Sequence, residues 1–175
     1  GDSDIPDENQ AYTIPQMIKD LHTVIYYMVG ESYYLMGYSM GARIALSYAL
    51  EYEREIKGLI LESGSVGIAS DAERAARCKA DEDLAVHIEE HDGAWFAARW
   101  AEAPIFESQK QLSEGVEELI YLRRSNNSPY ALASTLRGSG QGVMPYVGDK
   151  LEKFSVKGLY VSGALDTKYT TIGRD

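Results

Sequence analysis

Residues 33–50, YYLMGYSMGARIALSYAL, decide the fold, because a Gly-x-Ser-x-Gly sequence joins a short apolar run to a helical pattern there. A nucleophile elbow requires this order: the glycines allow a sharp strand-to-helix turn that exposes the serine at the carboxyl end of the strand. Ser39 is therefore predicted to be the elbow serine. The backbone N–H of Met40 is the expected oxyanion donor at the start of the helix. The alternative is a serine that only caps the helix.

Two further apolar runs read as buried strands, IKGLILESG at 56–64 and VKGLYVSGALD at 156–166. A helix is expected over 14–29, where apolar residues recur three and four positions apart. Each strand follows a helical stretch, which indicates a parallel sheet. The predicted fold class is α/β, namely an α/β-hydrolase fold with a partial parallel sheet, flanking helices and a helical cap inserted between strands.

The cap is predicted from about 90 residues between the second and third strands. Helices are expected over 71–92, 93–106 and 115–140, with breaks at Pro104, Gly115 and Pro129. The expected division is therefore a first part of the core at 1–66, a cap at 67–148, and a second part of the core at 149–175.

Composition excludes several classes of protein. A net charge of −10 argues against a nucleic-acid binder, which needs a basic face. The single cysteine, Cys78, cannot form an internal disulfide, which fits a cytoplasmic protein. No apolar run approaches the length of a transmembrane helix, so no membrane span is expected. The sequence gives no indication of the oligomeric state.

The other members of a catalytic triad are sought in the order serine, acid, histidine. Asp166 follows the third strand, where the acid belongs, although it could be a simple turn residue. The three histidines, His22, His87 and His91, all precede Asp166, so none fits this order. An HGGG-like oxyanion loop is also missing. The sequence is therefore expected to be an internal fragment of a larger α/β-hydrolase, inactive alone because the catalytic histidine is absent from it.

Longer strings resemble one α/β-hydrolase family, the 2-succinyl-6-hydroxy-2,4-cyclohexadiene-1-carboxylate synthases of menaquinone biosynthesis. The resemblance begins at Gly1, in a GDSD turn, and extends to the last residue. It is carried by the elbow region and by ERAARCKADEDLA, WAEAPIFESQK, LRRSNNSPYALASTLRGSGQG and SGALDTKY. Thr135 and Val66 depart from the pattern of the family.

The resemblance implies a lyase that eliminates pyruvate from 2-succinyl-5-enolpyruvyl-6-hydroxy-3-cyclohexene-1-carboxylate. Ser39, activated by a histidine and Asp166, would be the base that removes a ring proton, and the Met40 amide would stabilise the enolate. It also implies a polycarboxylate substrate as the partner and no metal or cofactor. The implied substrate-binding residues are Tyr38, Arg43, Arg77, Trp100 and Arg124, with Arg137 as a weaker candidate. Each arginine could instead be a solvated helix residue paired with a nearby glutamate.

Two other functions remain open on the sequence. The same fold could carry a carboxylesterase or a carbon–carbon bond hydrolase. An apolar ester would need no arginine cluster, so a comparison of both substrate types would discriminate. The chain could also be a non-catalytic ligand-binding or truncated module. A histidine downstream of Asp166 in the gene would favour the enzyme.

Overall fold

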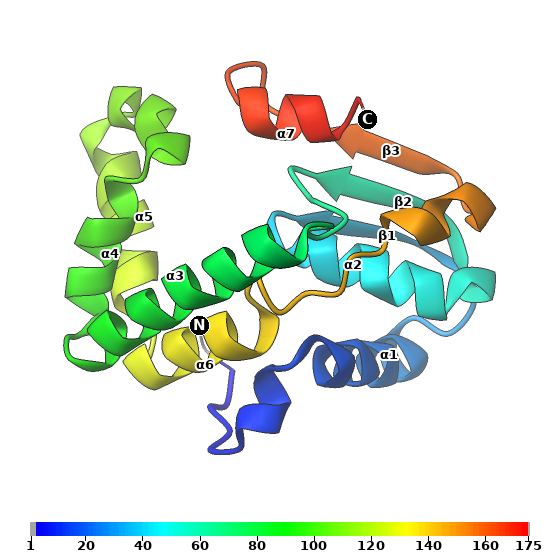
Figure 1. Cartoon of the computed structure of the whole chain (residues 1–175), viewed down its shortest axis with the longest axis horizontal. Coiled ribbons are helices and arrows are strands. Elements are labelled where there is room, and N and C mark those ends of the chain that lie inside the picture. The colour runs from blue at the N-terminus through cyan, green and yellow to red at the C-terminus, as the bar shows by residue number, and fades with distance from the viewer. Residues whose placement is uncertain (1–2, 175) are drawn as a thin grey trace.

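The computed structural model describes residues 3–174, in which three parallel strands form one sheet beside a group of helices (Figure 1). Strands β1 (Tyr33–Tyr38), β2 (Ile56–Glu62) and β3 (Gly158–Val161) lie in the order β1-β2-β3. Both strand pairs are parallel, as the alternation of strands and helices predicts. Gly1 and Asp2 of the GDSD turn, and the last residue, Asp175, lie outside the described residues.

The helices lie before, between and after these strands. Helix α1 (Ile14–Met28) precedes β1, α2 (Met40–Glu51) follows it, and α7 (Thr167–Ile172) follows β3. Between β2 and β3 lie α3 (Asp71–Glu89), α4 (Gly93–Ala101), α5 (Glu114–Ser125) and α6 (Pro129–Ser139). Shorter 3-10 helices are η1 (Asn9–Tyr12), η2 (Glu53–Glu55), η3 (Pro104–Gln111) and η4 (Gly148–Lys153).

Side-chain caps explain where three of the helices begin. Ser70 accepts a hydrogen bond from the backbone N–H of Glu73 at the start of α3. Asp92 and Ser128 cap α4 and α6 in the same way. Such caps satisfy N–H groups that have no partner inside the helix, which stabilises the helix by about 1 kcal/mol.

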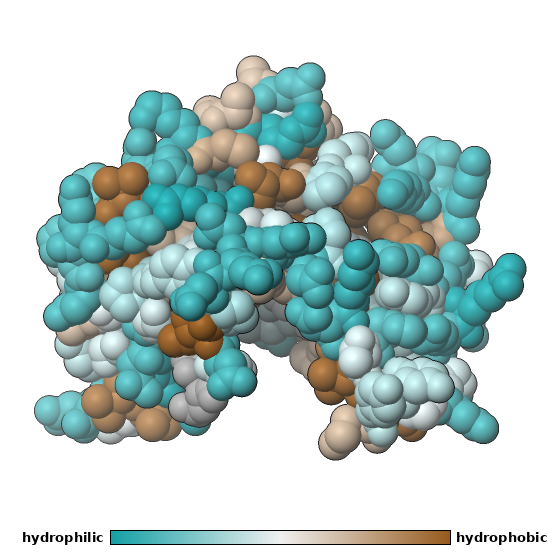
Figure 2. All heavy atoms as spheres, turned by 90° about the horizontal axis from the view of Figure 1, so that it is seen from below, coloured by the Kyte–Doolittle hydropathy of each residue, from teal (hydrophilic) through white to brown (hydrophobic). Residues whose placement is uncertain are grey.

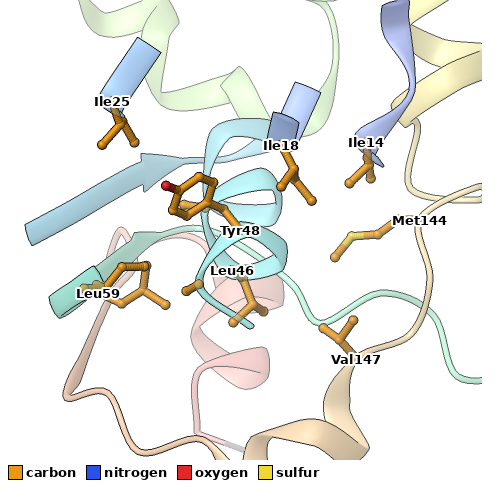
Figure 3. Close-up of a cluster of buried hydrophobic side chains, with 11 residues drawn as sticks. Ile14, Ile18, Ile25, Leu46, Tyr48, Leu59, Met144 and Val147 are labelled. Atoms are coloured by element: carbon orange, nitrogen blue, oxygen red, sulfur yellow. The ribbon is translucent and has the colours of Figure 1, made fainter. Parts of the chain in front are cut away.

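The main hydrophobic core lies between α1, α2 and one face of the sheet (Figure 3). Its buried members are Ile14, Ile18, Ile25, Ala45, Leu46, Tyr48, Ala49, Ile56, Leu59, Met144 and Val147. Tyr48 is fully buried, and its hydroxyl lies 2.6 Å from the hydroxyl of Tyr33. Burial raises the pKa of Tyr48. The core therefore fixes α2, and with it the elbow, against the sheet.

The helices between β2 and β3 stand to one side of the sheet (Figure 1). Helix α3 packs along α6, and α4 packs along α5. Arg137 of α6 lies 2.8 Å from Glu82 and 2.5 Å from Glu89, both on α3, so ion pairs join these two helices. The arrangement is that expected of an inserted cap, although the boundaries at 66/67 and 148/149 stay a prediction.

Three expectations about local structure are wrong. Gly115 does not break a helix but lies in the first turn of α5, where the backbone N–H needs no helical partner. The helix expected over 93–106 ends at Ala101, and a 3-10 helix starts at Pro104. The third strand ends at Val161 rather than at Asp166, because Val161 pairs with Glu62, the last residue of β2, and Asp166 is the N-cap of α7.

The face of the sheet that points away from α2 carries exposed apolar side chains. Tyr34, Met36 and Tyr38 of β1 are 59–72% exposed, and Leu159 and Val161 of β3 are also exposed. By contrast, the face seen in Figure 2 is mostly hydrophilic, with apolar atoms in separate patches. None of the described helices has the length and apolar character needed to cross a bilayer.

Candidate active site

Ser39 lies at a strained turn between β1 and α2. Its backbone has a φ of 52° and a ψ of −111°, and its N–H donates to the carbonyl of Glu62 at 2.8 Å. A serine at positive φ costs of the order of 1–3 kcal/mol, which the surrounding structure has to offset. A Cβ added at Gly37 would lie 2.3 Å from the carbonyl oxygen of Gly41, so this turn requires glycine there. The backbone has the form of a nucleophile elbow.

The side chain of Ser39 makes no capping hydrogen bond with α2, so the reading of Ser39 as a simple helix cap is not supported. Met40 is the first residue of α2, and its N–H has no acceptor within the part of the chain that the structure describes. An unpaired N–H at this place can stabilise negative charge that develops beside Ser39.

A cavity of about 380 Å³ opens beside Ser39, between the elbow, the inserted helices and α7. It brings together five of the predicted site residues: Ser39, Met40, Arg43, Arg77 and Trp100. It is also lined by residues to which the sequence analysis gave no role, among them Phe106, Gln141, Lys168 and Tyr169. Gln141 and Lys168 lie inside the quoted strings GSGQG and SGALDTKY, but neither a single polar residue in a loop nor one in the short helix α7 gives a spacing signal.

Arg43 is buried in the wall of this cavity, with 8% of its surface exposed. Its Nη1 donates to the carbonyl of Ser139 at 2.9 Å, and it forms no ion pair with a carboxylate of the described residues, although Asp81 acts on it electrostatically from farther away. Burial lowers the pKa of Arg43, while the proximity of Tyr169 opposes this shift. A buried cation without a carboxylate partner is costly unless an anion binds beside it.

Arg77 of α3 is held by two acceptors. Its Nε lies 2.8 Å from Oδ1 of Asp81, and its Nη1 lies 3.1 Å from Oε1 of Gln141. The Asp81 side chain is 7% exposed, and its Oδ2 has no hydrogen-bond partner among the described residues. These bonds leave the second terminal nitrogen of Arg77, Nη2, available to a ligand.

Arg124 and Tyr38 do not line this cavity. Arg124 lines a neighbouring cavity of about 270 Å³, and Phe106 lines both. The Arg124 guanidinium lies 4.5 Å from the centre of the Phe106 ring, and its Nη2 donates to Gln109 at 3.1 Å. Burial lowers the pKa of Arg124. Tyr38 is 59% exposed on β1.

Asp166 caps α7, and its Oδ1 accepts a hydrogen bond from the N–H of Tyr169 at 3.0 Å. It is not among the lining residues, although α7 contributes Lys168 and Tyr169 to the cavity. Its role as triad acid stays a prediction.

The three histidines all lie away from the Ser39 cavity. His22 of α1 stacks on Tyr52 and lies 3.3 Å from Glu55. His87 and His91 stack on Trp95. None of them lines the cavity, as the order of the triad residues predicts. No group of three or more metal-ligating side chains gathers in residues 3–174.

The fold and the elbow define an α/β-hydrolase. The family model described as serine aminopeptidase, S33, matches residues 1–91, more than half of the chain. The chain belongs to this family.

Particular relatives share more of the chain. A Bacillus subtilis (strain 168) protein, provisionally named a 2-succinyl-6-hydroxy-2,4-cyclohexadiene-1-carboxylate synthase, is 31% identical over all 175 residues, which cover 64% of that protein. The synthase of that name from Serratia proteamaculans (strain 568) is 32% identical over 146 residues, 83% of this chain and 56% of that one. This chain thus spans less than two thirds of either relative.

Solved structures agree with this relationship. The structure of MenH from S. aureus matches with a TM-score of 0.92 at 31% identity, over 99% of this chain and 64% of that one. A thermophilic esterase from Thermogutta terrifontis matches with a TM-score of 0.82 at 21% identity, over 99% of this chain and 63% of that one. The second likeness shows the shared fold alone.

Proposed function

We propose that this chain carries the elbow and carboxylate-binding part of a 2-succinyl-6-hydroxy-2,4-cyclohexadiene-1-carboxylate synthase, a cytoplasmic lyase of menaquinone biosynthesis. The substrate is 2-succinyl-5-enolpyruvyl-6-hydroxy-3-cyclohexene-1-carboxylate, and pyruvate is the leaving product. The observation that carries the proposal is the cavity in which the strained Ser39 meets two arginines, Arg43 and Arg77. The relatives that bear the name of this synthase supply the substrate class.

The electrostatics of the cavity favour an anionic ligand. The protein has a net charge of −10, so a polycarboxylate is repelled overall and needs a local positive pocket. Arg43 has no carboxylate partner within residues 3–174, and Arg77 keeps donors free. A planar guanidinium can bind a carboxylate through two parallel hydrogen bonds. An apolar ester would leave Arg43 without an ion-pair partner.

The reaction starts with the removal of a ring proton. Ser39 is the base, activated by a histidine that Asp166 orients. The electron pair forms a new ring double bond, the existing ring double bond shifts toward the carbon that bears the enolpyruvyl oxygen, and the bond between this carbon and oxygen breaks. The enolate of pyruvate leaves and becomes pyruvate when it takes up a proton. The N–H of Met40 stabilises the negative charge that develops on an oxygen of the substrate.

The proposal requires a histidine from outside these 175 residues, because His22, His87 and His91 lie away from Ser39. Asp166 also has to bind that histidine. Its side chain either leaves the cap of α7 to do so or orients the histidine while it still caps the helix. Without the histidine, the serine hydroxyl has no acceptor for its proton. The 175-residue chain alone is then expected to show only residual catalysis.

The test measures pyruvate release by the protein made from the complete coding sequence that contains this chain. We expect turnover that Ser39→Ala abolishes, whereas Arg77→Ala lowers kcat/KM by about 30-fold or more because a desolvated charge pair is lost. Arg99→Ala is the matched control, because Arg99 is an exposed arginine paired with Glu102 outside the cavity. Pyruvate release that survives Ser39→Ala, or hydrolysis of simple esters without pyruvate release, would contradict the proposal.

A further inference from the structure

A chain of hydrogen bonds crosses one wall of the Ser39 cavity. Nη1 of Arg77 lies 3.1 Å from Oε1 of Gln141, and Nε2 of Gln141 lies 3.1 Å from the hydroxyl oxygen of Tyr169. All three residues line the cavity. Arg77 belongs to α3, Gln141 follows α6, and Tyr169 belongs to α7. The chain thus connects the inserted helices to the segment that Asp166 caps.

The chemistry of these groups fixes the direction of every bond. A guanidinium has donors only, so the atom of Gln141 that faces Arg77 must be the carbonyl oxygen. The amide nitrogen of Gln141 therefore faces Tyr169 and donates to its hydroxyl oxygen. A hydroxyl that accepts in this way keeps its own proton for another acceptor. No described residue accepts that proton.

Apart from the cavity that it lines, Tyr169 is enclosed by protein. Tyr169 is 4% exposed, so bulk water has little access to it. Arg43 lies close enough to Tyr169 for the two to interact electrostatically, and a guanidinium cannot accept a proton. Tyr169 therefore belongs to a cavity wall whose cations, Arg43, Arg77 and Lys168, offer donors only.

We propose that Tyr169 donates a hydrogen bond to a carboxylate of the ligand in the Ser39 cavity, and that Gln141 is the positioning residue that fixes the direction of this bond. The inference rests on the proposed function, in which the ligand is a polycarboxylate, and adds a contact from α7. A hydrogen bond to a charged acceptor is stronger than one between neutral groups. Its loss weakens binding by about tenfold.

The test is a double-mutant cycle on the protein made from the complete coding sequence that contains this chain, with tricarballylate as the probe in isothermal titration calorimetry. Gln141→Glu replaces the amide nitrogen with an acceptor, so the carboxylate accepts from both Arg77 and Tyr169 and turns the Tyr169 proton away from the cavity. We expect Tyr169→Phe to raise Kd about tenfold in the original chain but less than about twofold in the Gln141→Glu chain. Tyr27→Phe, which removes an exposed hydroxyl from α1, is the matched control and should leave Kd unchanged.

The outcomes separate this inference from the proposed function. If Arg43→Ala abolishes binding but Tyr169→Phe leaves Kd unchanged, the carboxylate site stands and the inference is wrong. An equal loss in both backgrounds would overturn the role of Gln141. If the original chain does not bind tricarballylate, the proposed site fails, and the inference fails with it. Tyr169→Phe keeps the buried ring and removes only the hydroxyl. The change in Kd that it causes alone therefore tests the hydrogen bond to the ligand even if the Gln141→Glu variant does not fold.

Discussion

At the scale of single residues, the elbow serine combines a chemical role with a conformational cost. Ser39 has a φ of 52°, a region that favours glycine. The sequence predicts this, because Gly37 and Gly41 flank the serine between a strand pattern and a helix pattern. Asp81 lies four residues after Arg77 on α3, a spacing that the sequence shows. Gln141, which binds Arg77, and Gln109, which binds Arg124, could not be predicted, because tertiary packing brings them to the arginines.

The strain at Ser39 leads to a stability prediction. Ser39→Gly should raise the free energy of unfolding by about 1 kcal/mol because glycine adopts this backbone without strain, although its extra freedom in the unfolded chain offsets part of the gain. Ser39→Ala, the matched control, should leave stability almost unchanged, since the side chain makes no capping bond. Urea denaturation of the three chains measures the differences. Destabilisation by Ser39→Gly would show that the turn carries no such strain.

At the scale of elements, the strands and helices follow the hydrophobic patterns closely, and the ends of elements account for most errors. The pattern of α1 predicts 14–29, and the helix spans Ile14–Met28. The third strand ends five residues before Asp166, because its partner β2 ends at Glu62, which pairs with Val161. Gly115 misled the prediction, since a glycine in the first turn of a helix looks like a break.

Asp166 has two roles to separate, the cap of α7 and the proposed triad acid. Asparagine caps a helix as well as aspartate does but cannot stabilise a charged histidine. Asp166→Asn should therefore keep the unfolding free energy of the 175-residue chain, whereas Asp166→Ala should lower it by about 1 kcal/mol. In the protein from the complete coding sequence, both substitutions should lower kcat by about 10⁴-fold. Near-normal pyruvate release by the Asp166→Asn variant would show that Asp166 only caps α7 and is not the triad acid.

At the scale of the whole molecule, the inserted helices and α7 are brought to the elbow by packing that no local pattern encodes. The sequence predicts a parallel sheet and a helical insertion, but the shared wall of Arg43, Arg77 and Tyr169 depends on how α3 and α7 approach α2. The spacing from Arg43 to Tyr169 is more than 120 residues, so only the folded topology brings the two together. The resemblance to a synthase family singled out Arg43 and Arg77 but not Tyr169 of α7, which lines the same cavity.

The two faces of the sheet differ, and this difference predicts self-association. The face toward α2 is packed, whereas Tyr34, Met36 and Tyr38 are exposed on the opposite face beside Leu159 and Val161. Parallel sheets are nearly always covered on both faces, and an exposed apolar face drives association. The 175-residue chain should therefore self-associate at micromolar concentration in analytical ultracentrifugation, and Met36→Lys should shift it toward monomer. Lys57→Met exchanges the same two residue types in the opposite direction at an exposed position of β2. This control variant should not shift the chain toward monomer. A chain that stays monomeric at high concentration and unfolds in a cooperative thermal transition would contradict this prediction, because the exposed apolar face would then not drive association.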